Sequence, residues 1–132
     1  MKVVVDTNVI ISALLIPEGN PAKIISLILN EKIKILYDNR IIFEYSDVLS
    51  RKEFNFPKEI INDLINYFKH EGEFINSDYE KIKFIDEEDK KFYEVYKTGK
   101  ADYLITGNIK HFPKENTIIL PKDFLLVFKE RE

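Results

Sequence analysis

The side chains of this sequence best suited to chemistry are an acid and polar groups placed at the ends of predicted strands. Asp6 follows the β-branched segment 2–5, and Asn108 follows a second apolar segment, 103–106, whose last residue is Thr106. In an open parallel sheet, ligands bind beyond the carboxyl ends of the strands. We therefore expect Asp6, Thr106 and Asn108 to lie at one edge of a sheet, where a ligand would reach them.

Two further acidic positions lie on predicted helices. The acidic run 86–89 opens the helix that precedes segment 103–106, so we expect its amino end near the same edge. Glu44 lies three residues after Ile41 and four before Val48, which places it at the border of an apolar helical stripe. A carboxylate that faces a core in this way is costly unless it has a partner, and a metal ion is one such partner.

Converging carboxylates indicate a particular kind of chemistry. Mg²⁺ and Mn²⁺ prefer oxygen ligands. A bound ion also removes the repulsion that would otherwise raise the pKa values of clustered acids. Such an ion lowers the pKa of an attacking water and stabilises negative charge on phosphoryl oxygens. The acids therefore predict a metal site suited to phosphodiester hydrolysis.

The elements that must position these residues alternate between short strands and amphipathic helices. This alternation predicts an α/β fold of three layers, in which helices cover both faces of a central parallel sheet. Segment 74–84 fits either a short strand or a connection. Strands are expected over 2–5, 33–37, 103–106 and 117–120, and helices over 22–29, 39–49, 57–71, 86–98 and 121–128.

Length and composition limit the alternatives. The 132 residues suit a single domain, 1–132, and 45% of them are hydrophobic. The absence of cysteine excludes disulfides and thiol chemistry, and it agrees with a cytoplasmic protein. No apolar run approaches the roughly 18 residues of a membrane span, so no membrane association is expected. Because the net charge is −3, nucleic-acid binding would need a local basic surface or metal ions.

Three motifs, taken in order, resemble those of PIN-domain ribonucleases. The resemblance spans nearly the whole chain, and it is closest to the group described as toxin components of toxin–antitoxin systems. The similar segments are VVVDTNVI at 3–10, FEYSDVL at 43–49, and DEED at 86–89 followed by ADYLITGN at 101–108.

This resemblance implies metal-binding and catalytic roles for Asp6, Glu44 and Asp89. It implies a Mg²⁺- or Mn²⁺-dependent endoribonuclease that cleaves RNA, is commonly a homodimer and is often neutralised by an antitoxin protein. Many members of the family carry Asp where this chain has Asn108. The amide oxygen of Asn108 is therefore a further candidate ligand, and the number of bound ions stays open.

Other residues are expected beside the site. Asn8 is expected to orient Asp6, and Thr106 to donate a hydrogen bond to a neighbouring carboxylate. Asp86 is assigned mainly to capping the helix, although a role at the site stays open. The candidates for contacts with RNA phosphates are Lys110, Lys90, Lys91, Lys114 and His111.

Two alternatives stand beside the nuclease. Asn108 favours a PIN fold that binds RNA or protein with weak or no catalytic activity. A haloacid-dehalogenase or receiver-type phosphoryl-transfer domain would also place an aspartate at a strand end. The dehalogenase pattern, however, expects a second aspartate where this chain has Asn8, and Asp38 as a receiver residue lacks an acidic pair near the amino terminus.

Overall fold

The computed structural model describes residues 1–79 and 83–131. Its strands are β1 (Lys2–Val5), β2 (Lys34–Tyr37), β3 (Glu73–Phe74), β4 (Tyr103–Ile105) and β5 (Ile118–Ile119). They form a five-stranded sheet in the order β3-β2-β1-β4-β5, and each pair of neighbouring strands is parallel. Because β1 lies between β2 and β4, the chain builds the sheet outward from its first strand in both directions.

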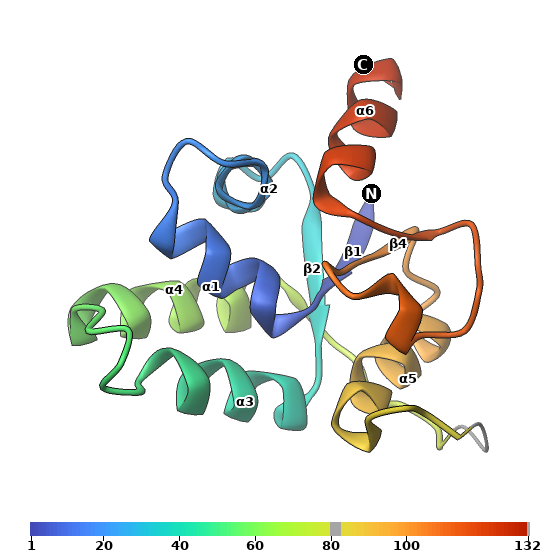
Figure 1. Cartoon of the computed structure of the whole chain (residues 1–132), viewed down its shortest axis with the longest axis horizontal. Helices are drawn as coiled ribbons and strands as arrows, with labels where there is room; N and C mark the ends of the chain where they lie inside the picture. Colours follow the sequence, from blue (N-terminus) through green and yellow to red (C-terminus); the bar gives the residue numbers. More distant parts are fainter. Residues whose placement is uncertain (80–82, 132) are drawn as a thin grey trace.

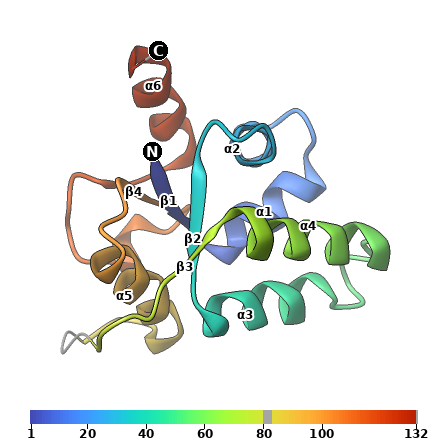
Figure 2. The ribbon, with the colours of Figure 1, turned by 180° about the vertical axis from the view of Figure 1, so that it is seen from behind.

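Helices occupy the segments between the strands. They are α1 (Thr7–Leu15), α2 (Asn20–Leu29), α3 (Asn39–Leu49), α4 (Lys58–Glu71), α5 (Lys90–Thr98) and α6 (Pro121–Arg131), with short 3₁₀ turns η1 (Glu87–Asp89) and η2 (Ile109–His111). Helices α1, α2 and α4 lie on one side of the sheet and α5 on the other (Figures 1 and 2). The predicted three-layer α/β/α fold is confirmed. Within the described residues no single helix is long and apolar enough to cross a membrane, although α1 and α2, bent by 102°, pass the same test as a pair.

The register of the central strands brings two of the predicted site residues together. All three valines at 3–5 are fully buried, as expected for a strand covered on both faces. Val5 of β1 pairs with Ile105 of β4, and the backbone N–H of Asp6 donates to the carbonyl of Ile105 at 3.0 Å. Asp6 and Thr106, the next residue on each strand, therefore emerge side by side at the carboxyl edge of the sheet.

Tyr45 fixes α3 beside this same edge. Its buried ring packs against Phe68 of α4 and Phe92 of α5, with ring centroids 5.9 and 6.5 Å apart. Its hydroxyl donates to the backbone carbonyl of Val5, the last residue of β1. This contact holds the preceding residue, Glu44, close to the point where β1 ends.

The structure differs from the sequence expectations in a few segments. Helix α1 occupies 7–15, for which no element was expected, because its apolar residues lie on several faces and form no single stripe. Helix α2 begins two residues early, since Pro21 suits the first turn of a helix. Helix α6 continues three residues beyond its expected end. Segment 74–84 contributes Phe74 to β3, and its residues 80–82 lie outside the described residues.

Candidate active site

Asp6 occupies the carboxyl edge of the sheet as the sequence predicts. Its side chain is buried, and the residue is only 4% exposed. The hydroxyl of Thr106 donates a hydrogen bond to Oδ2 of Asp6 at 2.7 Å, which is the carboxylate contact expected of this threonine. The same hydroxyl oxygen accepts from the backbone N–H of Asn108 at 3.0 Å. Thr106 therefore ties Asp6 to the loop that follows β4.

Glu44 faces this edge from α3, with its side chain 24% exposed. Its two carboxylate oxygens already have partners. The hydroxyl of Thr7, the first residue of α1, donates to Oε2, and the ammonium of Lys91 lies 2.6 Å from Oε1. A partly buried carboxylate needs a partner, and Glu44 has one in Lys91 of α5.

Asp89 lies at the end of η1, immediately before α5. Its side chain is 17% exposed, and Nδ1 of His111 lies 3.1 Å from its Oδ2. Asp86 caps η1 through a hydrogen bond from the backbone N–H of Glu88 to its Oδ1 at 3.0 Å. Asp86 therefore makes the capping contact, and Asp89 presents a partly buried carboxylate.

The pKa of Asp6 is raised by its burial and by the two other acids. Burial is the largest cause that raises the pKa of Asp6, and the hydrogen bond from Thr106 opposes it. Repulsion from Asp89 and then from Glu44 raises the pKa of Asp6 further. Burial also raises the pKa of Asp89, a rise that the hydrogen bond with His111 opposes. Glu44 of α3 and Asp89 of η1 therefore lie near enough to Asp6, which follows β1, to repel its carboxylate.

The remaining predicted residues lie around this region at different depths. Asn108 is half-buried, and its backbone N–H contacts Thr106. Asn8 is exposed, and its backbone, rather than its side chain, lowers the pKa of Asp6. Lys110 is exposed on η2. The structure therefore gives Asp6, Glu44 and Asp89 a shared environment and leaves Asn8 and Lys110 at its margin.

The sequence reasoning missed three partners of the acids. No pattern in the sequence predicts Thr7 as a donor to Glu44. The sequence predicts Lys91 and His111 only as contacts for RNA phosphates. One signal was available for Lys91, because a lysine in the first turn of a helix opposes the helix dipole. No local pattern indicated His111, whose contact depends on how the loop after β4 folds back.

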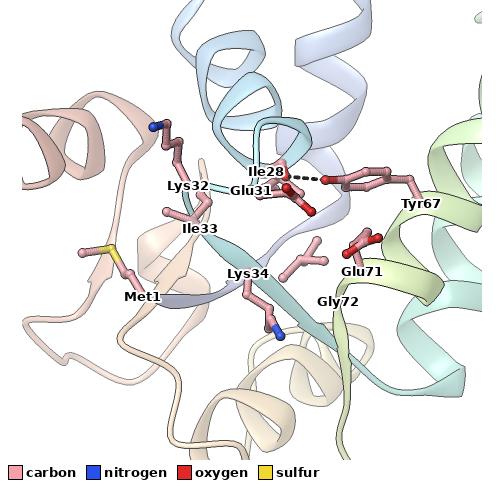
Figure 3. Close-up of a pocket in the computed structure, with 10 residues that line it drawn as sticks. Met1, Ile28, Glu31, Lys32, Ile33, Lys34, Tyr67, Glu71 and Gly72 are labelled. Carbon is pink, nitrogen blue, oxygen red and sulfur yellow. Dashed lines mark hydrogen bonds between the residues drawn. The ribbon is translucent and has the colours of Figure 1, made fainter.

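Two surface hollows could hold a ligand, and they lie at different positions relative to the sheet. A groove of about 780 Å³ runs beside Glu44 and Lys91 and is bordered by Phe43, whose side chain is 72% exposed. A second hollow of about 310 Å³ lies where β2 begins, and the carboxylates of Glu31 and Glu71 face it (Figure 3). Of these two hollows, the groove is the one lined by an acid of the carboxyl edge, Glu44, and ligands of parallel sheets bind at that edge.

The fold and the acidic edge together define a known class of nuclease domain. The chain matches the PIN-domain family over residues 2–110, a range that contains Asp6, Glu44, Asp89 and Asn108. The chain therefore belongs to the PIN-domain family, whose members are generally nucleases. This membership argues against the dehalogenase and receiver alternatives.

The chain is also similar to a known protein along nearly its whole length. The chain is 32% identical over 145 aligned residues to an uncharacterized protein of Methanocaldococcus jannaschii. The alignment covers 98% of this chain and 93% of the relative. No solved structure matches the chain.

Proposed function

We propose that this protein is a metal-dependent endoribonuclease that hydrolyses RNA phosphodiester bonds, with Asp6, Glu44 and Asp89 as its essential acids. The observation that carries the proposal is the environment of Asp6. This carboxylate lies at the carboxyl edge of the sheet, where it is buried and repelled by Asp89 and Glu44. Such a group is unfavourable in the protein alone, and a bound cation would make it favourable.

The donors at this edge support a divalent ion. PIN domains typically use divalent metals, and carboxylate oxygens suit Mg²⁺ or Mn²⁺. Within residues 1–79 and 83–131, no three His, Cys, Asp or Glu side chains are already gathered as a ligand set. Asp6 and Asp89 would hold the ion, with Glu44 beside them and the amide oxygen of Asn108 as a further candidate. The ion would supply Lewis-acid stabilisation of the phosphate and a more acidic water.

The chain's own hydrogen bonds would orient these acids for that role. Thr106 fixes one oxygen of Asp6, Thr7 fixes one oxygen of Glu44, and His111 fixes one oxygen of Asp89. Partners of this kind hold metal-binding side chains in one orientation and tune their affinity. The hydrogen bonds from Thr106 and His111 are made to Oδ2 of Asp6 and Oδ2 of Asp89, so the Oδ1 atoms of these acids are the candidates to hold the ion.

The wider biological role follows from the family resemblance. We propose that the whole chain acts as one cytoplasmic PIN domain, as the toxin of a toxin–antitoxin pair, and that it forms a homodimer. Exposed apolar side chains support surfaces for protein partners, among them Leu15 and Ile16 after α1, which are 53% and 56% exposed. Light scattering of the purified chain, and co-purification with the product of the adjacent gene, would test these two associations.

A fluorescent single-stranded RNA tests the proposed activity. We expect cleavage that requires Mn²⁺ or Mg²⁺, stops with EDTA and falls at least about 1,000-fold in Asp6→Asn. Asp102→Asn is the matched control, because Asp102 lies at the opposite edge, where it accepts from the backbone N–H of Lys2 at 2.7 Å. Cleavage that survives EDTA, or that is unchanged in Asp6→Asn, would overturn the proposal.

A second candidate is a PIN fold that binds RNA or protein without cleaving it. Two observations favour it, namely Asn108 in place of an acid and the engagement of both Glu44 oxygens by Thr7 and Lys91. This candidate predicts RNA binding without cleavage at every Mn²⁺ concentration. It also predicts that Asp6→Asn leaves RNA affinity unchanged.

A further inference from the structure

Lys91 lies where a lysine is normally unfavourable. It is in the first turn of α5, at the positive end of the helix dipole, and it is only 8% exposed. A buried ammonium destabilises a protein unless it is paired and hydrogen-bonded. A buried cation at its amino end does not stabilise helix α5. We therefore ask which groups the ammonium of Lys91 contacts.

The contacts of Lys91 are acidic and well fixed. Its ammonium lies 2.6 Å from Oε1 of Glu44 and donates to the backbone carbonyl of Glu88. Oε2 of Glu88 is farther away, at 3.4 Å, and the Glu88 side chain is 83% exposed. Lys91 also lowers the pKa of Asp89. The ammonium is therefore held beside two of the three acids proposed to act in catalysis.

The charges at this edge balance with one divalent ion. The buried and partly buried acids Asp6, Glu44 and Asp89 carry three negative charges, Asn108 carries none, and Lys91 contributes one positive charge, whereas Asp86 and Glu88 are exposed and screened by solvent. Two negative charges remain, which one Mg²⁺ or Mn²⁺ neutralises. A second ion would leave the partly buried cluster with an excess of positive charge. It would also have to displace Lys91 from Glu44, because both oxygens of Glu44 are engaged.

We propose that the active site takes a single divalent ion and that the ammonium of Lys91, paired with Glu44, serves as its second cation. The inference rests on the proposed function and specifies how that site is built. Nucleases with two ions place positive charge on both sides of the scissile phosphate. Lys91 borders the same groove as Glu44, so its ammonium supplies positive charge on one side of a phosphate bound there. A preorganised cation of this kind stabilises charge that develops on phosphoryl oxygens.

Mn²⁺ binding to the full chain tests this inference without reference to activity. Calorimetry and electron paramagnetic resonance would give the number of ions bound by the wild type, Lys91→Met, Asn108→Asp and the double variant. We expect one ion in the wild type and one ion, bound about tenfold more tightly, in Lys91→Met, because a nearby positive charge is removed. We expect two ions in the double variant, whose net site charge is two units more negative.

Lys90→Met is the matched control. Lys90 precedes Lys91 in the same helical turn and is also buried, at 9% exposed, but its ammonium lies 4.2 Å above the ring of Tyr79. We expect Lys90→Met to bind one ion with the wild-type affinity. Lys91→Gln, which keeps a hydrogen-bond donor without the charge, repeats the test should the methionine variant fold poorly, and we expect it too to bind the ion more tightly.

The possible results separate this inference from the proposed function. Two ions bound by the wild type would overturn the role of Lys91 and leave the metal-dependent nuclease intact. One ion in every variant, with no gain in affinity when the charge of Lys91 is removed, would also overturn it. No ion bound by the wild type would overturn the proposed metal dependence and this inference together.

Discussion

Asp6 holds a carboxylate where the protein alone stabilises it poorly. It is almost fully buried, its pKa is raised, and the hydrogen bond from Thr106 compensates only in part. Groups of this kind are common at active sites, because function there is gained at some cost in stability. The position of Asp6 was predicted from the end of a strand. Its burial and the neighbouring acids explain why a charged carboxylate at this position lowers stability.

Replacement of Asp6 by asparagine should therefore stabilise the metal-free protein near neutral pH. The folded state holds the proton of Asp6 to a higher pH than the unfolded chain does. The free energy of unfolding is therefore greatest below the ordinary pKa of aspartate and falls as pH rises through the raised pKa. In EDTA at pH 7 we expect the free energy of unfolding of Asp6→Asn to exceed that of the wild type by about 0.5–2 kcal/mol. Urea melts from pH 3 to 8 would measure the difference.

Excess Mn²⁺ should reverse this order, because only the wild type would gain stability from binding the ion. Asp89, whose pKa is also raised, and Glu115, whose pKa is lowered, are present in both proteins. The difference between the unfolding free energies of the wild type and Asp6→Asn therefore reports on Asp6. A metal-free Asp6→Asn variant that is less stable than the wild type at pH 7 would contradict this description of the site.

The acids could be predicted from the sequence more readily than their partners. Asp6, Glu44 and Asp89 each lie at a position that a strand end, an apolar stripe or a helix start marks in the sequence. Lys91 and His111 contact Glu44 and Asp89 across elements that are distant in the chain. Such pairs depend on the packing of α3 against α5 and on the path of the loop after β4, which no local pattern encodes.

The elements that the sequence predicted well are those with one buried face. Helices α3 and α4 present a single apolar stripe, and their expected bounds match the structure within a residue. Helix α1 packs against both α2 and α3, and it also carries apolar residues outside its buried side, such as the exposed Leu15. It therefore lacks the narrow stripe that would identify it. Strand β3 has two residues, which is too few for an alternating pattern.

Gly72 follows α4 at a point where the backbone of the chain passes close to β2. A Cβ placed on this residue would lie 2.4 Å from the backbone oxygen of Phe68 and 2.7 Å from that of Ile35. Because both neighbours are backbone atoms, they cannot move aside without distorting α4 or β2. We expect Gly72→Ala to lower the free energy of unfolding by about 1–3 kcal/mol. Gly107→Ala is the control, since its Cβ would meet no atom within 4 Å, and equal losses in the two variants would contradict the prediction.

The position of the site follows from the topology of the whole molecule. The sheet grows from β1 to β2 on one side and from β1 to β4 on the other. Chain connections then leave in opposite directions, and a crevice opens at the carboxyl ends of these strands. Asp6 and Thr106 lie at the ends of β1 and β4, so the strand order alone brings them together. The family resemblance added the chemistry that topology does not specify.

The charge of the whole molecule predicts how it should bind RNA. A net charge of −3 provides little general attraction for phosphates, so the bound ion must offset the acids at the contact. We expect the affinity of Asp102→Asn and of the wild type for single-stranded RNA to fall at least about tenfold when Mn²⁺ is replaced by EDTA. Fluorescence anisotropy at constant ionic strength would measure this change. Equal affinity with and without the ion would contradict it.

The chemistry of the cleaved RNA ends provides the most direct test of hydrolysis at this acidic edge. Attack on phosphorus by a water leaves a linear phosphate at the cut, whereas attack by the neighbouring 2′-hydroxyl leaves a 2′,3′-cyclic phosphate. Mass spectrometry of RNA cleaved by the wild type with Mn²⁺ in ¹⁸O-labelled water should show linear phosphate ends that carry one labelled oxygen. Cyclic phosphate ends, or the same labelled products from Asp6→Asn at the wild-type rate, would contradict metal-assisted hydrolysis at Asp6.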